Sequence, residues 1–226
     1  ENNLIFLEKK IDLLFTPTNL YAKELNSTLP CITLPPGGNI NNVKYDAAKR
    51  EGVIYVGGVS ERYGTRILLH SFKKINEKYN IPLTIVCRKK TEIFSDYIDF
   101  SWLNIQHWDN SQIKKYYSKY KIAIIPIEKS SYHEFALPFK LFEYASFGLP
   151  IAVSDNYEQI RLVKENKLGV NIGSTVGSFS TNVFNFYNDT ESLNQYHHNS
   201  LTFIKQKGLW KHRVETIINQ YRGLSE

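Results

Sequence analysis

The chain has 226 residues, of which 42% are hydrophobic and 22% charged, so it can form one large or two small domains with a buried core. This composition excludes a disordered or low-complexity protein, and no run of about 18 apolar residues is present to form a transmembrane helix. The net charge of +6 comes from scattered lysines, which do not indicate nucleic-acid binding. Such a charge is compatible with solvated surface lysines, with peripheral contact with an acidic membrane surface, or with phosphorylated ligands.

The two cysteines, Cys31 and Cys87, are too few for a disulfide framework or a cysteine-based metal site. They fit a reducing compartment, so we expect a cytoplasmic location, including the inner face of the membrane. The first ten residues, "ENNLIFLEKK", are too polar for a signal peptide. The sequence contains no methionine, so we expect either that it starts inside a longer protein or that modified methionines are missing from it.

The N-terminal part of the chain predicts a few short elements followed by a break. Residues 3–9 resemble the end of a helix, 12–19 predict a strand, and a Thr or Asn cap begins a helix over 19–26. A second strand starts at Cys31 and runs into the sequence Pro-Pro-Gly-Gly-Asn. This cluster of chain-breaking residues is the strongest in the sequence, so we place a domain boundary after residue 36.

From residue 43 to about residue 188, short apolar strands alternate with amphipathic helices. The expected strands are 52–58, 82–88, 103–108, 121–127, 149–154 and 169–173, and the expected helices are 62–79, 111–120, one that opens near residue 137, and 156–166. Almost no strand alternates polar with apolar residues, which is typical of strands buried on both faces. The pattern predicts an α/β fold with a doubly wound, Rossmann-like parallel sheet, followed by a helical tail over 189–222.

Ligands of open parallel sheets bind at the carboxyl ends of the strands, and two sets of residues are expected there. Gly57 and Gly58 follow the first strand of the sheet, where glycine lets the backbone approach an anion at a helix N-terminus. A plain tight turn is the alternative. Arg88 and Trp108 end two neighbouring strands and could frame a nucleobase, whereas simple packing is the alternative for the tryptophan.

The third candidate is the loop 128–138 and the helix that it opens. Ser131 brings a hydroxyl group, and Pro138 suits a first helical turn because its missing N–H costs nothing there. Lys140 offers a positive charge to a phosphate, and Glu143, one turn later on the same face, suits a pair of ribose hydroxyls. The alternative is a surface Lys–Glu pair that stabilises the helix by about 0.2–0.5 kcal/mol.

The segment "LPFKLFEYASFGLPIAVSD" (137–155) resembles the signature of GT-B-fold retaining glycosyltransferases of the group 1 type, which use nucleotide sugars. Members of that family show P-x-K-x-x-E-y-x-a-x-G-x-P-i-x-x-s-d at this point. The matching residues are Pro138, Lys140, Glu143, Gly148, Pro150, Ser154 and Asp155. The upstream "VIYVGGVSERYGTRILLHSF" is similar to the first strand and helix of the family's nucleotide-binding domain, so the resemblance extends over nearly the whole chain.

This resemblance implies a division of the chain into three parts. Residues 1–36 look like a remnant of the N-terminal acceptor domain with its linker, and residues 37–188 look like the nucleotide-sugar-binding, Rossmann-like domain. Residues 189–226 look like the C-terminal helices that pack back towards the N-terminal domain. The chain then forms the C-terminal half of a GT-B fold, and we expect it to be incomplete and weakly active by itself.

The resemblance also implies roles for the candidate site residues. Glu143 would hold the ribose of the donor nucleotide, Lys140 and the start of its helix would face the diphosphate, and Gly57 and Gly58 would approach the same phosphates. The family often has Arg directly after the first glycine of that loop and Lys directly before the second. Those positions are Gly58 and Tyr63 here, so the neighbouring Arg62 becomes the candidate that replaces the missing charges.

The implied reaction transfers a sugar from a nucleoside diphosphate sugar to a hydroxyl of a glycan or of a lipid-linked acceptor. Lys140 and Arg62 are the candidate catalytic cations that stabilise the leaving diphosphate, with retention of configuration. The sequence contains no Asp-x-Asp motif, so we expect no metal and no cofactor besides the donor. Two alternatives from other classes are a nucleotide-sugar epimerase and a non-catalytic interaction module that keeps the fold.

Overall fold

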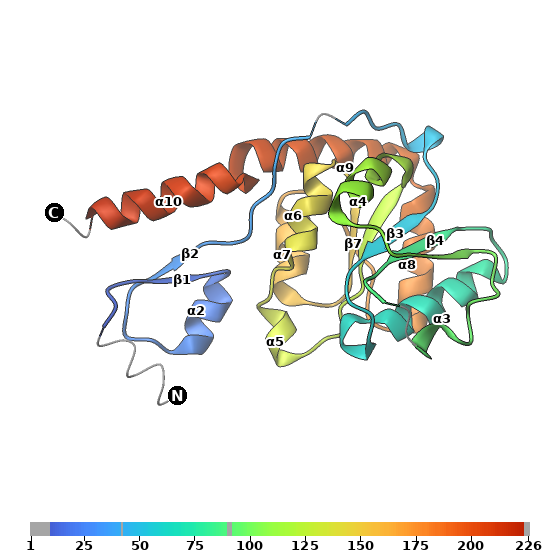
Figure 1. The fold of residues 1–226 in the computed structure, drawn as a ribbon, viewed down its shortest axis with the longest axis horizontal. Helices are drawn as coiled ribbons and strands as arrows, with labels where there is room; N and C mark the ends of the chain where they lie inside the picture. The colour runs from blue at the N-terminus through green and yellow to red at the C-terminus, as the bar shows by residue number, and fades with distance from the viewer. Residues whose placement is uncertain (1–9, 42, 90–91, 224–226) are drawn as a thin grey trace.

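The computed structural model describes residues 10–41, 43–89 and 92–223, which form a small N-terminal unit and a larger sheet with its helices (Figure 1). In the N-terminal unit, strand β1 (Leu14–Thr16) pairs in parallel with β2 (Cys31–Thr33), and helix α2 (Asn19–Leu25) connects them. The side chain of Thr18 caps α2 by accepting a hydrogen bond from the backbone N–H of Tyr21 at 3.1 Å. These elements confirm the two strands and the helix predicted for this region, whereas the predicted helix end at 3–9 lies outside the described residues.

The main sheet has six parallel strands in the order β5-β4-β3-β6-β7-β8. The strands are β3 (Val53–Val56), β4 (Leu83–Val86), β5 (Leu103–Gln106), β6 (Ile122–Ile125), β7 (Ile151–Val153) and β8 (Gly169–Asn171). The order of the strands reverses at β3, because the chain runs outwards to β4 and β5 and then returns to the other side of β3 as β6. This arrangement confirms the Rossmann-like doubly wound sheet and opens a crevice at the carboxyl ends of the strands.

Helices cover both faces of this sheet (Figure 1). Helices α3 (Thr65–Asn76) and α8 (Val176–Asn188) pack on one face, and α4 (Asn110–Tyr116), α6 (Phe139–Ser146) and α7 (Tyr157–Glu165) pack on the other. Strand β3 shows why both faces need a cover. Val53 and Tyr55 belong to the core under α3 and α8, whereas Ile54 and Val56 belong to the core on the opposite face. Because successive side chains of a strand point to opposite faces, a strand that is apolar throughout needs a cover on both sides.

Two parts of the structure differ from the sequence-based expectation. Helix α8 was not predicted, because "VGSFSTNVFNFYN" is rich in residues of low helix propensity; the burial of Phe179 and Val183 against the sheet overrides that preference. The expected helical tail is divided into α9 (Thr190–Phe203) and α10 (Trp210–Gly223) by a π-helical turn over Ile204–Gly208. A short helix, α5 (Ser131–Glu134), also lies within the predicted loop 128–136.

The N-terminal unit and the segment after it contact the larger part at defined points. The Thr18 hydroxyl donates to the backbone carbonyl of Phe135 at 2.9 Å, and the ring of Tyr21 stacks on that of Phe135 with centroids 4.8 Å apart. Further along, the guanidinium of Arg213 on α10 donates twice to the carbonyl of Pro36, at 3.2 and 3.1 Å. Residues that lead from the small unit into the sheet therefore run along the start of α10.

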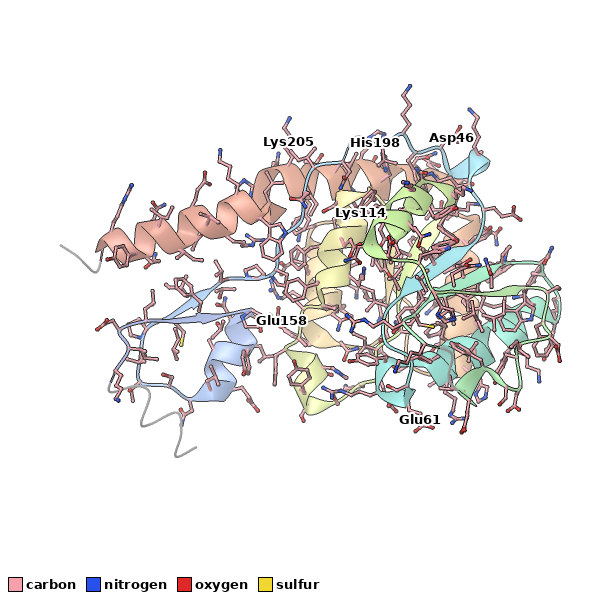
Figure 2. The ribbon with its side chains drawn as sticks, in the orientation of Figure 1. Asp46, Glu61, Lys114, Glu158, His198 and Lys205 are labelled. Carbon is pink, nitrogen blue, oxygen red and sulfur yellow. The ribbon has the colours of Figure 1, made fainter. Side chains whose placement is uncertain are left out.

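Charged side chains are spread over the molecule rather than gathered in one band. In Figure 2, Glu61 near the start of α3, Lys114 on α4 and Lys205 after α9 lie well apart. Within the described part of the chain, no helix combines the length and the apolar character that a membrane-spanning helix needs. Cys31 and Cys87 are both free thiols.

Candidate functional site

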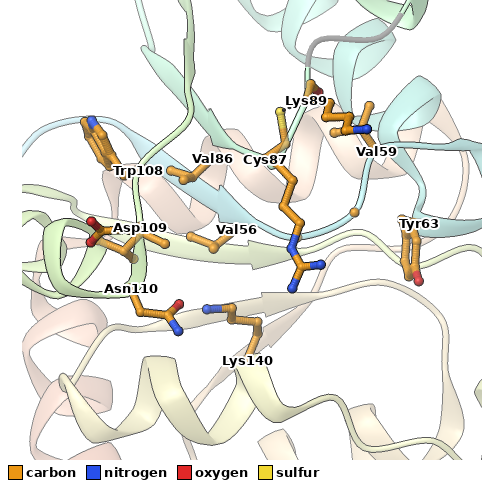
Figure 3. Close-up of a pocket in the computed structure, with 14 residues that line it drawn as sticks. Val56, Val59, Tyr63, Val86, Cys87, Lys89, Trp108, Asp109, Asn110 and Lys140 are labelled. Atoms are coloured by element: carbon orange, nitrogen blue, oxygen red, sulfur yellow. Dashed lines mark hydrogen bonds between the residues drawn. The ribbon is translucent and has the colours of Figure 1, made fainter.

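A cavity of about 830 Å³ opens at the carboxyl ends of β3, β4 and β5 (Figure 3). It collects residues from four places that are distant in the sequence: Gly57 and Gly58 after β3, Arg88 and Lys89 after β4, Trp108 and Asn110 around the start of α4, and Lys140 on α6. Figure 3 shows Lys140 extending from α6 towards Asn110, with Trp108 and Tyr63 at opposite ends of the cavity. The strand order therefore brings Gly57, Gly58, Arg88, Trp108 and Lys140 of the predicted site residues to one place.

The two glycines are required by neighbouring tyrosines rather than by an unusual backbone conformation. Neither Gly57 nor Gly58 has a positive φ angle. A Cβ atom on Gly57 would lie 2.6 Å from the hydroxyl of Tyr55, and one on Gly58 would lie 2.7 Å from Cδ2 of Tyr63. The Tyr55 hydroxyl also donates to the Gly58 carbonyl at 2.6 Å, and the Gly57 N–H donates to the carbonyl of Val86 at 3.1 Å. The loop is thus held in place from both sides, and both glycines line the cavity.

Arg62 is not among the residues that line this cavity. Its guanidinium carbon lies 5.4 Å from the ring centroid of Tyr132, whereas the next residue, Tyr63, turns its ring towards Gly58 and the cavity. Both residues belong to the short 3₁₀ helix over Glu61–Tyr63, where consecutive side chains point in different directions. The structure therefore does not bring Arg62 together with Lys140.

Arg88 supplies a positive charge to the cavity from the end of β4. The Arg88 side chain is exposed and lines the cavity together with Lys140. Among the described residues its guanidinium has no hydrogen-bond or ion-pair partner. A guanidinium presents several N–H donors in a planar fork, which suits the oxygens of a phosphate.

Lys140 and Glu143, one turn apart on α6, form the ion pair that the sequence left as an alternative. The Lys140 ammonium lies 2.5 Å from Oε2 of Glu143, and about a quarter of each side chain is exposed. The other carboxylate oxygen, Oε1, accepts a hydrogen bond from the hydroxyl of Tyr117 at 2.9 Å. Glu143 itself lines a smaller cavity of about 220 Å³ that shares Asn110 with the large one. The ion pair therefore connects the two cavities.

The sequence did not predict Tyr117 as a site residue. Among the described residues, it is the completely buried side chain that forms a hydrogen bond with Glu143. It is completely buried, and its ring lies 4.8 Å from that of Phe147 and 5.8 Å from that of Tyr144, centroid to centroid. Burial, followed by the neighbouring Tyr144 and Glu143, raises the pKa of the Tyr117 hydroxyl well above its usual value, so the group stays a neutral donor. No sequence signal pairs Tyr117 with a glutamate 26 residues away on a different element.

Ser131 and Pro138 lie beside the cavity rather than in its wall. Ser131 is the first residue of α5 and is exposed, while the neighbouring Ser130 caps that helix by accepting from the N–H of His133 at 3.2 Å. Pro138 is the cap residue of α6 and not its first helical residue, one position earlier than expected. The backbone N–H groups of Phe139 and Lys140, at the start of the helix, have no partner within it.

Trp108 combines the two roles that the sequence left open. One part of the half-buried ring stacks on Tyr116 with centroids 4.2 Å apart, and the residue also lines the large cavity. The preceding His107 bonds through Nδ1 to the carbonyl of Cys87 at 2.8 Å and so ties the end of β5 to the end of β4. An aromatic ring and an arginine thus stand on neighbouring strand ends, with the space between them open.

The described residues contain no group of three or more His, Cys, Asp or Glu side chains close enough together to hold a metal ion. The chemistry that the cavity offers is that of cations and backbone N–H groups. Lys140, Arg88 and the open N-terminus of α6 can neutralise an anion, and the aromatic ring of Trp108 can contact a flat apolar group. A nucleotide has both of these parts.

Comparisons with known proteins give the same fold over nearly the whole chain. A sucrose-phosphate synthase from Thermosynechococcus elongatus is 14% identical with a TM-score of 0.77, and the match covers 99% of this chain and 61% of that one. An α,α-trehalose-phosphate synthase (UDP-forming) from Burkholderia vietnamiensis is 9% identical with a TM-score of 0.75, covering 100% and 65%. WaaG, a glycosyltransferase involved in lipopolysaccharide biosynthesis, is 12% identical with a TM-score of 0.71, covering 90% and 60%.

This chain therefore spans less than two thirds of the length of these solved structures. No curated protein sequence matches it. The sequence model of the glycosyl transferases group 1 family matches residues 50–189, which include the whole six-stranded sheet and every residue that lines the large cavity. The chain belongs to the glycosyl transferases group 1 family, and its sheet domain is the Rossmann-like half of a GT-B fold.

Proposed function

We propose that this chain is the donor-binding part of a glycosyltransferase that moves a sugar from a nucleoside diphosphate sugar to a hydroxyl of a glycan or a lipid-linked acceptor. The observation that carries the proposal is the 830 Å³ cavity at the point where the strand order reverses, with Lys140, Arg88 and Trp108 in its wall. Family membership supports the reaction class. Two similar structures, a UDP-forming synthase and a glycosyltransferase involved in lipopolysaccharide biosynthesis, support a nucleotide donor and a glycan or lipid acceptor.

In this proposal the site acts mainly on the leaving group. When the bond between the sugar and the diphosphate breaks, negative charge develops on the phosphate oxygens and has to be stabilised. Lys140 and the open N–H groups at the start of α6 do so from one side of the cavity, and Arg88 does so from the other. Arg88 takes the role that the sequence suggested for Arg62, because Arg62 lies against Tyr132 outside the cavity wall. The reaction then needs no metal, and we extend the proposal to retention of configuration.

The remaining parts of the chain are assigned on the same basis. The small β1-α2-β2 unit, within residues 1–36, is proposed to be part of the acceptor-binding domain, and α9 and α10 to be the helices that connect it with the sheet domain. The contacts of Arg213 with Pro36 and of Thr18 with Phe135 support this assignment. A catalytic site between two domains would then be incomplete here, so the chain should bind a nucleotide but transfer sugar slowly. The free thiols and the positive charge support a cytoplasmic location near the inner face of a membrane.

Calorimetric titration of the chain with UDP, GDP and ADP tests the proposal. We expect saturable binding of at least one diphosphate, weakened about 10- to 100-fold by Lys140→Met and by Arg88→Met, since a charge-assisted hydrogen bond contributes about 1.5–3 kcal/mol. Lys164→Met is the matched control, because Lys164 is exposed near the end of α7 and also carries one positive charge. If a folded wild-type chain binds none of the three, the donor-binding proposal fails and a non-catalytic interaction module becomes the better explanation.

A further inference from the structure

The carboxylate of Glu143 is held at both oxygens, and the two partners differ in kind. Oε1 accepts from Tyr117, whose side chain is completely buried, while Oε2 is paired with Lys140, whose side chain is 27% exposed. Lys140 also reaches the wall of the large cavity, whereas Tyr117 does not. One oxygen thus has a fixed partner and the other has a partner that a ligand can draw away.

We propose that Tyr117 is a positioning residue for the ribose of the donor: its buried hydroxyl fixes one oxygen of Glu143, so that the other oxygen is presented to the ribose when the diphosphate takes Lys140. This inference rests on the proposed function, because it needs a nucleotide in the cavity. It adds a residue on a different element, the 3₁₀ turn over Tyr117–Lys119, to the two that lie on α6.

Packing explains why the Tyr117 hydroxyl stays on Glu143. The ring is enclosed by Phe147 and Tyr144, and none of its surface is exposed. A buried hydroxyl without a partner is unfavourable, so the hydroxyl cannot exchange Glu143 for water without moving the whole ring. Because burial raises the pKa of this hydroxyl, it remains protonated and keeps donating to the carboxylate.

The ion pair explains why a complete nucleotide would bind better than the sum of its parts. Without a diphosphate, Lys140 occupies Oε2 of Glu143, the oxygen that the ribose needs. A diphosphate offers Lys140 a stronger anionic partner, and the move of the ammonium frees the carboxylate oxygen. Both side chains are about three quarters buried, so the exchange takes place without unfolding α6. A nucleoside without phosphates has to displace Lys140 from Glu143 but provides no anionic partner for the ammonium group.

The first test compares Tyr117→Phe with the wild type, using UDP, GDP and ADP, their 2′,3′-dideoxy forms, and inorganic pyrophosphate. We expect Tyr117→Phe to reduce the preference for ribose over dideoxyribose about tenfold, while the affinity for pyrophosphate stays unchanged. Tyr187→Phe is the matched control: its hydroxyl is also buried and accepts from the backbone N–H of Gly52 at 2.9 Å, at the amino end of β3, away from the cavity. If Tyr117→Phe binds ribose nucleotides, dideoxy nucleotides and pyrophosphate more weakly by the same factor, the role of Tyr117 is merely structural and the proposal is overturned.

The second test uses Lys140→Met with uridine, guanosine and adenosine. This variant should bind the matching diphosphate more weakly but the free nucleoside more tightly, by severalfold, because Oε2 of Glu143 is no longer occupied. A weaker or unchanged affinity for the nucleoside contradicts the exchange. If the wild type binds no diphosphate at all, the proposed function itself fails; if it binds one and the two variants behave otherwise than expected, only the positioning role fails.

Discussion

Replacing Tyr144 by phenylalanine tests how the crevice at the strand reversal is built. Strands β3 and β6 pair only at Val53 with Ile122 and at Ile54 with Ala123. Two residues further along, the backbone N–H of Val56 donates to the Tyr144 hydroxyl at 2.9 Å instead of to β6. Tyr144 is completely buried and Val56 is 6% exposed, so water has no access to this hydrogen bond. The hydroxyl on α6 therefore replaces the strand partner where the two strands separate.

Tyr144→Phe removes that acceptor and leaves the Val56 N–H buried without a partner, which costs about 1–3 kcal/mol of unfolding free energy. We expect the free energy of unfolding, measured in urea at pH 7, to fall by an amount near the middle of this range. The m-value should stay unchanged because the surface exposed on unfolding is the same. Tyr187→Phe provides the comparison, because Tyr187 is 9% exposed and its partner N–H, that of Gly52, lies at the end of the sheet. A loss for Tyr144→Phe of less than about 0.5 kcal/mol would mean that Val56 finds another acceptor, and would refute this account of the crevice.

Two further variants test other parts of the structure. Burial lowers the pKa of His197, whose Nδ1 bonds to the Gly148 carbonyl at 2.8 Å, so the unfolded chain binds this proton more readily and stability should fall as the pH drops below about 6.5. His197→Phe should flatten that part of the pH dependence in urea unfolding, and an unchanged slope would contradict the assignment. Gly58→Ala should push the Tyr63 ring by about 1 Å into the cavity and weaken diphosphate binding in calorimetry, with little effect on stability because that ring is 41% exposed. Adding Tyr63→Ala should restore the affinity, and a double variant as weak as Gly58→Ala would show that the ring is not responsible.

The fold could be predicted from the sequence because its signal is local and repeated. Strands that are buried on both faces read as continuous apolar runs, and each was followed by a segment with helical spacing or by turn residues. The helix missed by this reading, α8, has weak local preference and depends on Phe179 and Val183 reaching a core that other elements build. The break between α9 and α10 has the same origin, since the Gly208 carbonyl accepts a hydrogen bond from the N–H of Gly38, far away in the sequence.

The sequence alone determined that Lys140 and Glu143 share one face of a helix, because they are three positions apart and a helical turn has about 3.6 residues. It also determined that Gly57 and Gly58 follow a buried strand. Only the tertiary structure decided which cation joins Lys140: Arg62 turns to Tyr132, and Arg88 arrives from the end of the neighbouring strand. It also decided that Tyr117 holds Glu143. The physical reason is that the face of a helix on which a side chain lies follows from its spacing in the sequence. Contacts between elements depend instead on strand order and packing, and no local sequence pattern specifies these.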